Sequence, residues 1–178
     1  FEDNTVYDYE IIYKNVPFSF LINIKKTSNQ VVAFGTGDIN REKNKLPVYN
    51  RHSWKDEFDC TTIFYSDPTL LLNDKVGLCW CYGVNEHWYL ESIAFLILEI
   101  IKKVGSEVND SVFFGSSAGG YTSLLLASML HAKAAVINPQ LIIPNFWERI
   151  FDNFKSTVLK KDEELLEGRI SALALFNR

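Results

Sequence analysis

Short apolar runs alternate along the chain with longer stretches in which apolar residues recur at helical spacing. Apolar runs bounded by turn residues predict strands, and they lie at 6–13, 18–24, 30–34, 61–65, 76–82, 111–114, 134–137 and 171–176. Helical spacing predicts helices at 86–104 and 121–130, an amphipathic helix that Pro144 opens, and a charged, solvated helix at 160–167. This alternation predicts an α/β fold with a mostly parallel sheet, in which the first two strands form an antiparallel edge hairpin.

The composition and charge of the chain fit one folded domain over residues 1–178. With 178 residues, of which 47% are hydrophobic and 14% aromatic, the chain can bury a substantial core, and this argues against intrinsic disorder. A net charge of -4 argues against a nucleic acid or an anionic membrane as a partner bound by bulk charge. The longest apolar run, 93–101, is interrupted by Glu99 and is too short to span a membrane.

Three cysteines, Cys60, Cys79 and Cys81, are too few for a disulfide scaffold in a chain of this length. Cys79 and Cys81 stand two apart in a predicted strand, so we expect their side chains on the same face of the sheet. No further Cys or His stands near them at metal-ligand spacing. We therefore predict no metal site, and we interpret the cysteines as buried apolar side chains of a cytoplasmic protein.

The motif that carries chemistry is Gly115-Ser116-Ser117-Ala118-Gly119, which fits the pattern G-x-S-x-G. It joins an apolar strand directly to an apolar helix, which is the context that this motif requires. Such a turn holds the serine hydroxyl above the carboxyl edge of a sheet, where free N–H groups at the helix start can stabilise an oxyanion. The motif predicts Ser117 as a nucleophile and the Ala118 N–H as a donor. The alternative is a Gly/Ser-rich loop that holds a phosphate, although the P-loop and Rossmann glycine patterns are absent.

With this motif, and with Asn138-Pro139-Gln140 at a later strand end, the stretch 31–140 resembles the α/β-hydrolase superfamily. Within it the chain is similar to bacterial surface-polysaccharide proteins, among them capsular polysaccharide O-acetyltransferases with a Ser-Asp-His triad. The resemblance implies a three-layer α/β-hydrolase-like fold and acyl transfer through an acyl-Ser117 intermediate. It implies a small-molecule or glycan substrate and no bound cofactor, with acetyl-CoA as the acyl donor if the protein is a transferase.

The second oxyanion donor in such folds comes from the loop after an earlier strand. Gly35-Thr36-Gly37 fits that place, so we predict the Thr36 N–H as this donor; an ordinary glycine turn is the alternative.

Aromatic side chains at the same edge suit stacking on sugar rings, although aromatics are more often core residues. The predicted substrate-binding residues are Gly35, Trp80, Tyr82, His87 and Gln140. For His87, a capping or surface role is the alternative.

A base for Ser117 is harder to assign, because the superfamily order is Ser, then Asp or Glu, then His. Only His131 follows Ser117, and it stands 14 positions on, at the far end of the same predicted helix. At ~1.5 Å per residue it lies about 20 Å from the serine, which is out of reach. His52 stands in a long polar connection, 38–59, and His87 as the base would break the order.

The acidic candidates after Ser117, Asp152 and Asp162, stand in predicted helices, whereas a triad acid is expected at the end of a strand. We therefore expect the Asp and His of the triad to lie beyond Arg178, so that residues 1–178 form an incomplete domain. Two functions stay open. The first is a serine esterase or O-acyltransferase acting on a carbohydrate or glycoconjugate. The second is a non-catalytic module of the same fold in a polysaccharide biosynthesis or glycoprotein secretion complex.

We expect the 178-residue chain by itself to hydrolyse activated esters poorly, because a serine without a base is a weak nucleophile. The rate of 4-nitrophenyl acetate hydrolysis checks this expectation. Full-strength turnover would show that the base lies within the chain.

Overall fold

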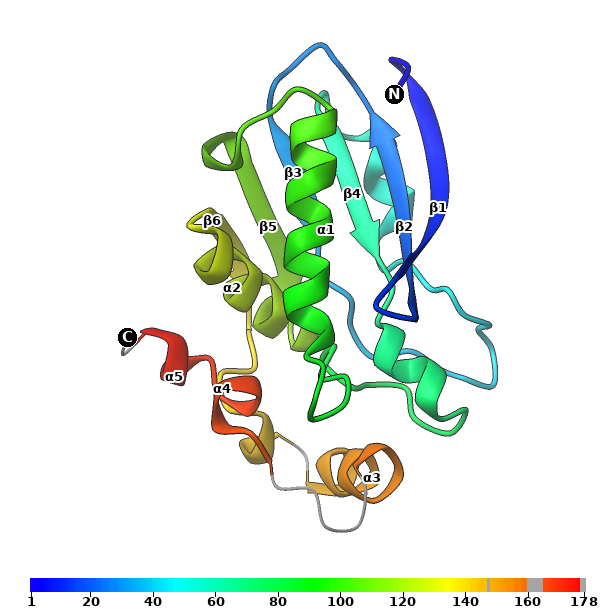
Figure 1. Cartoon of the computed structure of the whole chain (residues 1–178), viewed down its shortest axis with the longest axis vertical. Helices are drawn as coiled ribbons and strands as arrows, with labels where there is room; N and C mark the ends of the chain where they lie inside the picture. Colours follow the sequence, from blue (N-terminus) through cyan, green and yellow to red (C-terminus); the bar gives the residue numbers. More distant parts are fainter. Residues whose placement is uncertain (147, 160–164, 177–178) are drawn as a thin grey trace.

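The computed structural model of the chain, described for residues 1–146, 148–159 and 165–176, is built on a six-stranded sheet (Figure 1). The strand order is β1-β2-β4-β3-β5-β6. Pairing is antiparallel between β1 and β2 and between β2 and β4, and parallel across the remaining pairs. This confirms the predicted mostly parallel sheet with antiparallel N-terminal strands. The strands are β1 Thr5–Tyr13, β2 Val16–Ile24, β3 Val31–Phe34, β4 Thr61–Tyr65, β5 Ser111–Ser116 and β6 Lys133–Ile137.

The edge hairpin of β1 and β2 turns through two residues with left-handed backbone. Lys14 has φ 48° and Asn15 has φ 62°, and such primed two-residue turns match the twist of the strands they connect. Pro17 lies in β2 opposite Ile12 of the edge strand β1. The predicted antiparallel hairpin is therefore present, at the edge of the sheet where it was expected.

Two helices, α1 Tyr89–Lys103 and α2 Ala118–Leu130, cover one face of the sheet (Figure 1). The predicted apolar stripe of α1 is buried, with its four members at most 4% exposed: Leu90, Ile93, Ile97 and Ile100. Alternate residues of β5 face the helices, and Phe113 is fully buried among them. This face of the sheet and the two helices form the main hydrophobic core.

The opposite face is covered by the connection between β3 and β4, which contains the short 3-10 helix η1 His52–Asp56. The ring of Phe34 stacks on Phe64 at 4.6 Å between centroids, and Phe58 and Trp54 contact Phe34 edge-on at 5.6 Å and 6.3 Å. This aromatic cluster fixes the connection against the sheet and provides the third layer of the fold.

The C-terminal segments lie beyond the end of the sheet toward which β4 points (Figure 1). They are the 3-10 helix η4 Ile143–Asn145, then α3 Glu148–Val158, α4 Glu167–Ile170 and α5 Leu173–Phe176. Phe154 anchors α3 through edge contacts with Trp80 at 5.4 Å and Tyr82 at 5.3 Å. The predicted helix after Pro144 therefore begins later, after a 3-10 turn. Of the predicted charged helix at 160–167, residues 160–164 lie outside the described residues.

Two predicted strands are wrong. The run 76–82 is an irregular buried segment in which Trp80 and Cys81 have φ of 52° and 54°, values that an extended strand does not adopt. Burial produced the apolar pattern there without the backbone of a strand, so the premise that Cys79 and Cys81 share a sheet face also fails. The run 171–176 begins with one isolated bridge, Ile142 to Ser171, and continues as α5.

Helix α1 begins at Tyr89, three residues later than predicted, and Asn85 does not cap it. Residues 84–87 instead form a tight turn in which the N–H of His87 donates to the carbonyl of Val84. The three cysteines are free and buried, as predicted. Among the described residues, none of the helices combines the length and apolarity that crossing a bilayer requires.

Shortening a buried side chain of α1 should destabilise the chain far more than shortening an exposed one. We expect Ile97→Ala to lower the free energy of unfolding by about 3 kcal/mol, because Ile97 is completely buried and leaves a cavity. Phe95→Ala on the same helix is the control: Phe95 is 46% exposed, so its loss should cost less than about 1 kcal/mol. Urea unfolding measures both, and equal losses would contradict the assigned core.

Candidate active site

Ser117 lies on a sharp turn between β5 and α2, at the carboxyl end of the sheet. Its backbone has φ 53° and ψ -122°, a region that non-glycine residues rarely occupy, and its side chain is exposed. Its N–H donates to the carbonyl of Ile137 at 3.1 Å, which ties the turn to β6. We call residues 115–119 the elbow. Strained backbone of this kind concentrates at functional sites.

Two glycines allow the elbow to lie against the loop that follows β3. A Cβ at Gly115 would lie 2.1 Å from the carbonyl oxygen of Gly119, and a Cβ at Gly35 would lie 2.2 Å from the same oxygen. No side chain fits at either distance. The two segments that the sequence predicts as halves of an oxyanion hole, at Ala118 and Thr36, therefore lie in contact, and their chemical role stays a prediction.

The hydroxyl oxygen of Ser117 accepts a hydrogen bond from Nε2 of Gln140 at 3.1 Å. Oε1 of Gln140 in turn accepts from the indole Nε1 of Trp80 at 2.6 Å, and the backbone N–H of Gln140 donates to the Ser117 carbonyl at 3.1 Å. The turn 138–140 thus wraps around the elbow, and the buried Trp80 fixes the orientation of the Gln140 amide. Gln140 therefore contacts Ser117, and its predicted role in substrate binding stays a prediction.

The side chain of Thr36 and the peptide N–H that follows it both bind Asn50. Oγ1 of Thr36 donates to Oδ1 of Asn50 at 3.1 Å, and the N–H of Gly37 donates to the same oxygen at 3.0 Å. The buried Tyr65 hydroxyl nearby donates to Oγ1 of Thr122 at 2.9 Å. Burial raises the Tyr65 pKa far above its usual value, and the Thr36 backbone acts weakly in the opposite direction.

Trp80 and Tyr82 do not offer their rings to a ligand in this structure, because they are only 2% and 0% exposed. The predicted stacking on sugar rings is therefore corrected to a core position for both. Trp80 acts on the site through Gln140, while the Tyr82 hydroxyl accepts a hydrogen bond from the N–H of Leu166 at 3.2 Å.

His87 belongs to the start of α1 rather than to the elbow. Its Nε2 lies 2.6 Å from Oγ of Ser92, and its ring contacts that of Tyr89 edge-on at 4.9 Å. Partial burial lowers its pKa, and the nearby cations Lys14 and Arg169 lower it further. These contacts tie His87 to the first turn of α1, which has no side-chain cap hydrogen bond, and they do not bring His87 to Ser117.

The other candidate bases are also remote from the elbow. His52 pairs its Nδ1 with the Tyr49 carbonyl at 2.8 Å, and His131 ends α2 at the opposite end from Ser117, as predicted. Asp152 is exposed on α3 beside Lys155, and Asp162 lies outside the described residues. Across the described part of the chain, no trio of Cys, His, Asp or Glu side chains is placed to bind a metal ion.

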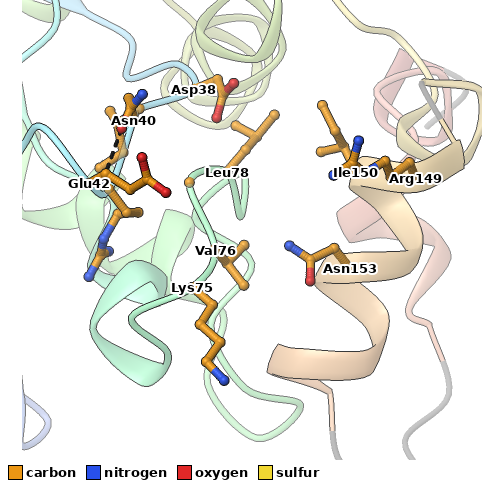
Figure 2. A pocket seen from close by; sticks show the side chains of 12 residues that line it. Asp38, Asn40, Glu42, Lys75, Val76, Leu78, Arg149, Ile150 and Asn153 are labelled. Carbon is orange, nitrogen blue, oxygen red and sulfur yellow. Dashed lines mark hydrogen bonds between the residues drawn. The ribbon is translucent and has the colours of Figure 1, made fainter.

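A cleft of about 740 Å³ opens between α3 and the loops 38–42 and 75–78 (Figure 2). Figure 2 shows Ile150 and Asn153 of α3 facing Val76 and Leu78 across the opening. Charged and amide side chains form most of the remaining lining, from Asp38, Asn40, Arg41, Glu42, Lys75 and Arg149. In sequence, the lining residue Asp38 lies two positions after Thr36 and Leu78 lies two positions before Trp80, while no residue of the elbow lines the cleft.

Two residues of the site, Asn50 and Arg51, were not identified by sequence reasoning. Asn50 holds the loop at Thr36 and Gly37, and Nη2 of Arg51 donates to Oγ of Ser116 at 2.7 Å. The only available signal was that the connection 38–59 is long and polar, since such connections in compact domains are often functional.

Comparison with known proteins supports the fold. The sequence profile of an uncharacterised protein family (UPF0227) matches residues 84–176, which include the elbow, Gln140 and α3. A search of curated protein sequences gives no match. Among solved structures, the capsule O-acetyltransferase of Neisseria meningitidis serogroup A is similar with a TM-score of 0.65 and 18% identity, over 85% of this chain and 61% of that one.

Two further solved structures are similar. The fluorophosphonate-binding serine hydrolase F of Staphylococcus aureus has a TM-score of 0.58 and 11% identity, over 99% of this chain and 73% of that one. A chain of the glycosylation-associated protein complex Gap123 from Streptococcus agalactiae has a TM-score of 0.63 and 12% identity, over 96% of this chain and 32% of that one. The chain thus has an α/β-hydrolase-like fold and spans 61% of the acetyltransferase.

The contact between the β3 loop and the elbow can be tested by adding one methyl group. We expect Gly35→Ala to lower the free energy of unfolding by about 2–3 kcal/mol, because its Cβ would meet the Gly119 carbonyl at 2.2 Å. Gly37→Ala is the matched control two residues on, where the nearest atom is 4.0 Å away, and it should change stability by less than about 1 kcal/mol. Equal effects in urea unfolding would argue against this contact.

Proposed function

This chain belongs to the uncharacterised protein family UPF0227, and from this premise we propose that it performs serine-nucleophile acyl-ester chemistry. It acts as an O-acetyltransferase or esterase on a carbohydrate or glycoconjugate, through an acyl-Ser117 intermediate. The observation that carries the proposal is the exposed Ser117 hydroxyl on a strained turn between a strand and a helix start. This geometry presents a nucleophile beside backbone N–H groups, which is the arrangement that acyl transfer requires.

The reaction begins when the Ser117 oxygen attacks the acyl carbonyl and its proton passes to a base. The carbonyl oxygen gains negative charge, and the Ala118 N–H in the first turn of α2 is the first donor for it. The tetrahedral intermediate expels the leaving group to give acyl-Ser117, which water or a sugar hydroxyl then resolves. Gln140 holds the serine oxygen through its Nε2 before attack. No described His or acid hydrogen-bonds Ser117, so the proposal assigns no base among the described residues.

The cleft of Figure 2 is the proposed place for the carbohydrate. Its charged and amide side chains can pair with sugar hydroxyl groups, and Val76, Leu78 and Ile150 offer an apolar surface for the C–H face of a sugar ring. The similar capsule O-acetyltransferase was solved in complex with CoA, which supports acetyl-CoA as the acyl donor if the protein is a transferase.

A second function is a non-catalytic module in a polysaccharide biosynthesis or glycoprotein secretion complex. Its support is the similarity to a chain of the Gap123 complex, together with the lack of a base at Ser117 among the described residues. In that case the elbow would be kept because the glycines and Ser117 hold β5, β6 and α2 together.

Fluorophosphonate labelling separates these two functions. We expect the full-length protein to be labelled on Ser117, because the reagent traps an activated serine. Ser117→Ala should lose at least about 90% of the labelling, because removing a nucleophile lowers its reaction by tenfold or more. Intact-protein and peptide mass spectrometry measures the label and its position. Ser128→Ala, near the far end of α2, is the control and should label like the parent protein. Equal labelling of the parent and Ser117→Ala would reject Ser117 as the nucleophile.

A further inference from the structure

The guanidinium group of Arg51 lies beside the elbow, and Arg51 is not among the residues that line the cleft. Its Nη2 donates to Oγ of Ser116 at 2.7 Å, and Ser116 directly precedes Ser117. Successive strand residues point to opposite faces, so Ser116 shares the face of Phe114, opposite to the face that Gly115 turns toward α2. Arg51 therefore approaches the nucleophile from the face covered by η1, and it does not line the cleft of Figure 2.

Several contacts fix the position of this guanidinium. Its Cζ lies 5.3 Å from the ring centre of Trp54 and 5.6 Å from that of Phe114, both within the range of cation–π attraction. The preceding residue, Asn50, accepts hydrogen bonds from Thr36 and Gly37. The loop is thus anchored to the segment that touches the elbow, and Arg51 is held in place before any ligand arrives.

The backbone of Arg51 is also unusual. It has φ 61° and ψ 17°, a left-handed conformation that is uncommon for a residue with a side chain. Holding such a conformation costs free energy, and residues of this kind gather at ligand-binding and catalytic positions. Arg51 stands between Asn50 and η1. Its left-handed backbone directs the side chain over the Trp54 ring toward Ser116.

The positive charge of Arg51 is not matched by any acid in the described part of the chain. The ion pairs there join Lys55 to Asp56, Lys102 to Glu99 and Lys155 to Asp152. A guanidinium has five N–H donors, and among the described residues the Arg51 side chain donates one hydrogen bond, to Ser116. A half-buried cation with donors to spare attracts an anion, and its planar fork matches the two oxygens of a carboxylate or phosphate.

We propose that Arg51 is the anion-recognition residue of the Ser117 site, where it binds a carboxylate or phosphate group carried by the substrate. The inference rests on the proposed function, because it places the anion next to the bond that Ser117 attacks. The charged group lies on the η1 side of the elbow, where the Arg51 side chain contacts Ser116. Two sources share this chemistry: the phosphates of a nucleotide-bearing acyl donor, and the acid group of an acidic glycan.

Isothermal titration calorimetry on the full chain tests the inference with two pairs of probes. Coenzyme A carries a phosphate-bearing adenosine nucleotide that pantetheine lacks, and methyl glucuronide carries a carboxylate that methyl glucoside lacks. We expect the charged member of one pair to bind at least tenfold more tightly than its neutral partner. Arg51→Met should remove this preference, and Arg51→Lys should keep part of it, because an ammonium retains the charge but not the planar fork.

Lys55→Met is the matched control, since Lys55 is a cation of the same segment whose partner is Asp56 rather than the elbow. It should keep the preference of the parent protein. Preference for coenzyme A would identify the donor phosphate, and preference for the glucuronide would identify an acidic glycan. Equal binding of charged and neutral probes by the parent protein, or a preference that survives in Arg51→Met, would overturn the inference.

Two further measurements keep the outcomes separate. If Arg51→Met does not fold, as judged by circular dichroism, Arg51→Lys together with a rise in salt from 50 to 500 mM takes its place, and both should weaken binding of the charged probe. Ser117→Ala should bind the charged probe like the parent protein, because binding needs no nucleophile. A parent protein that is not labelled at Ser117 but keeps the Arg51-dependent preference would thus reject the proposed function alone, and a parent protein labelled at Ser117 without the preference would reject the inference alone.

Discussion

The structure depends on one close approach of backbone to backbone. Gly35, at the end of β3, and Gly115, at the end of β5, both lie where any side chain would meet the carbonyl of Gly119. Because those side chains are absent, α2 begins against the ends of two parallel strands instead of standing off from them. Everything at this edge follows: the strain at Ser117, the contact of the β3 loop with the elbow, and the path by which the connection 38–59 returns over the sheet.

Around this contact the site is assembled in two halves that are supported differently. In one half, the serine oxygen is held by the amide of Gln140, and the buried indole of Trp80 sets the orientation of that amide. In the other half, the guanidinium of Arg51 is held between aromatic rings. One half is fixed by the core and the other by a surface connection, so they differ in how strongly the fold restrains them. The restraint is greater where the supporting side chains are buried.

Local pattern predicted the sheet well, because strands such as β4 and β5 alternate or run apolar between clear turns and need no distant information. It failed at 76–82, since burial on all sides gives an apolar run whatever the backbone does, and it failed at 171–176, since four-residue helices are too short to show a period. The elbow was predictable from its glycine spacing. Arg51 was not, because it meets Ser116 across 65 positions and stands in a segment without periodicity.

The anchoring of Trp80 has a consequence for how such a sequence can change. Its ring packs edge-on against Phe154 of α3, while its Nε1 holds the amide that touches Ser117. Position 154 therefore belongs to the hydrophobic core and also, through two intervening side chains, to the surroundings of the serine oxygen. A change in ring size at 154 shifts the indole, and the shift is transmitted to Gln140. Substitutions at positions 80, 140 and 154 should accordingly occur together among descendants of this chain, because a change in core packing there also changes the surroundings of the serine oxygen.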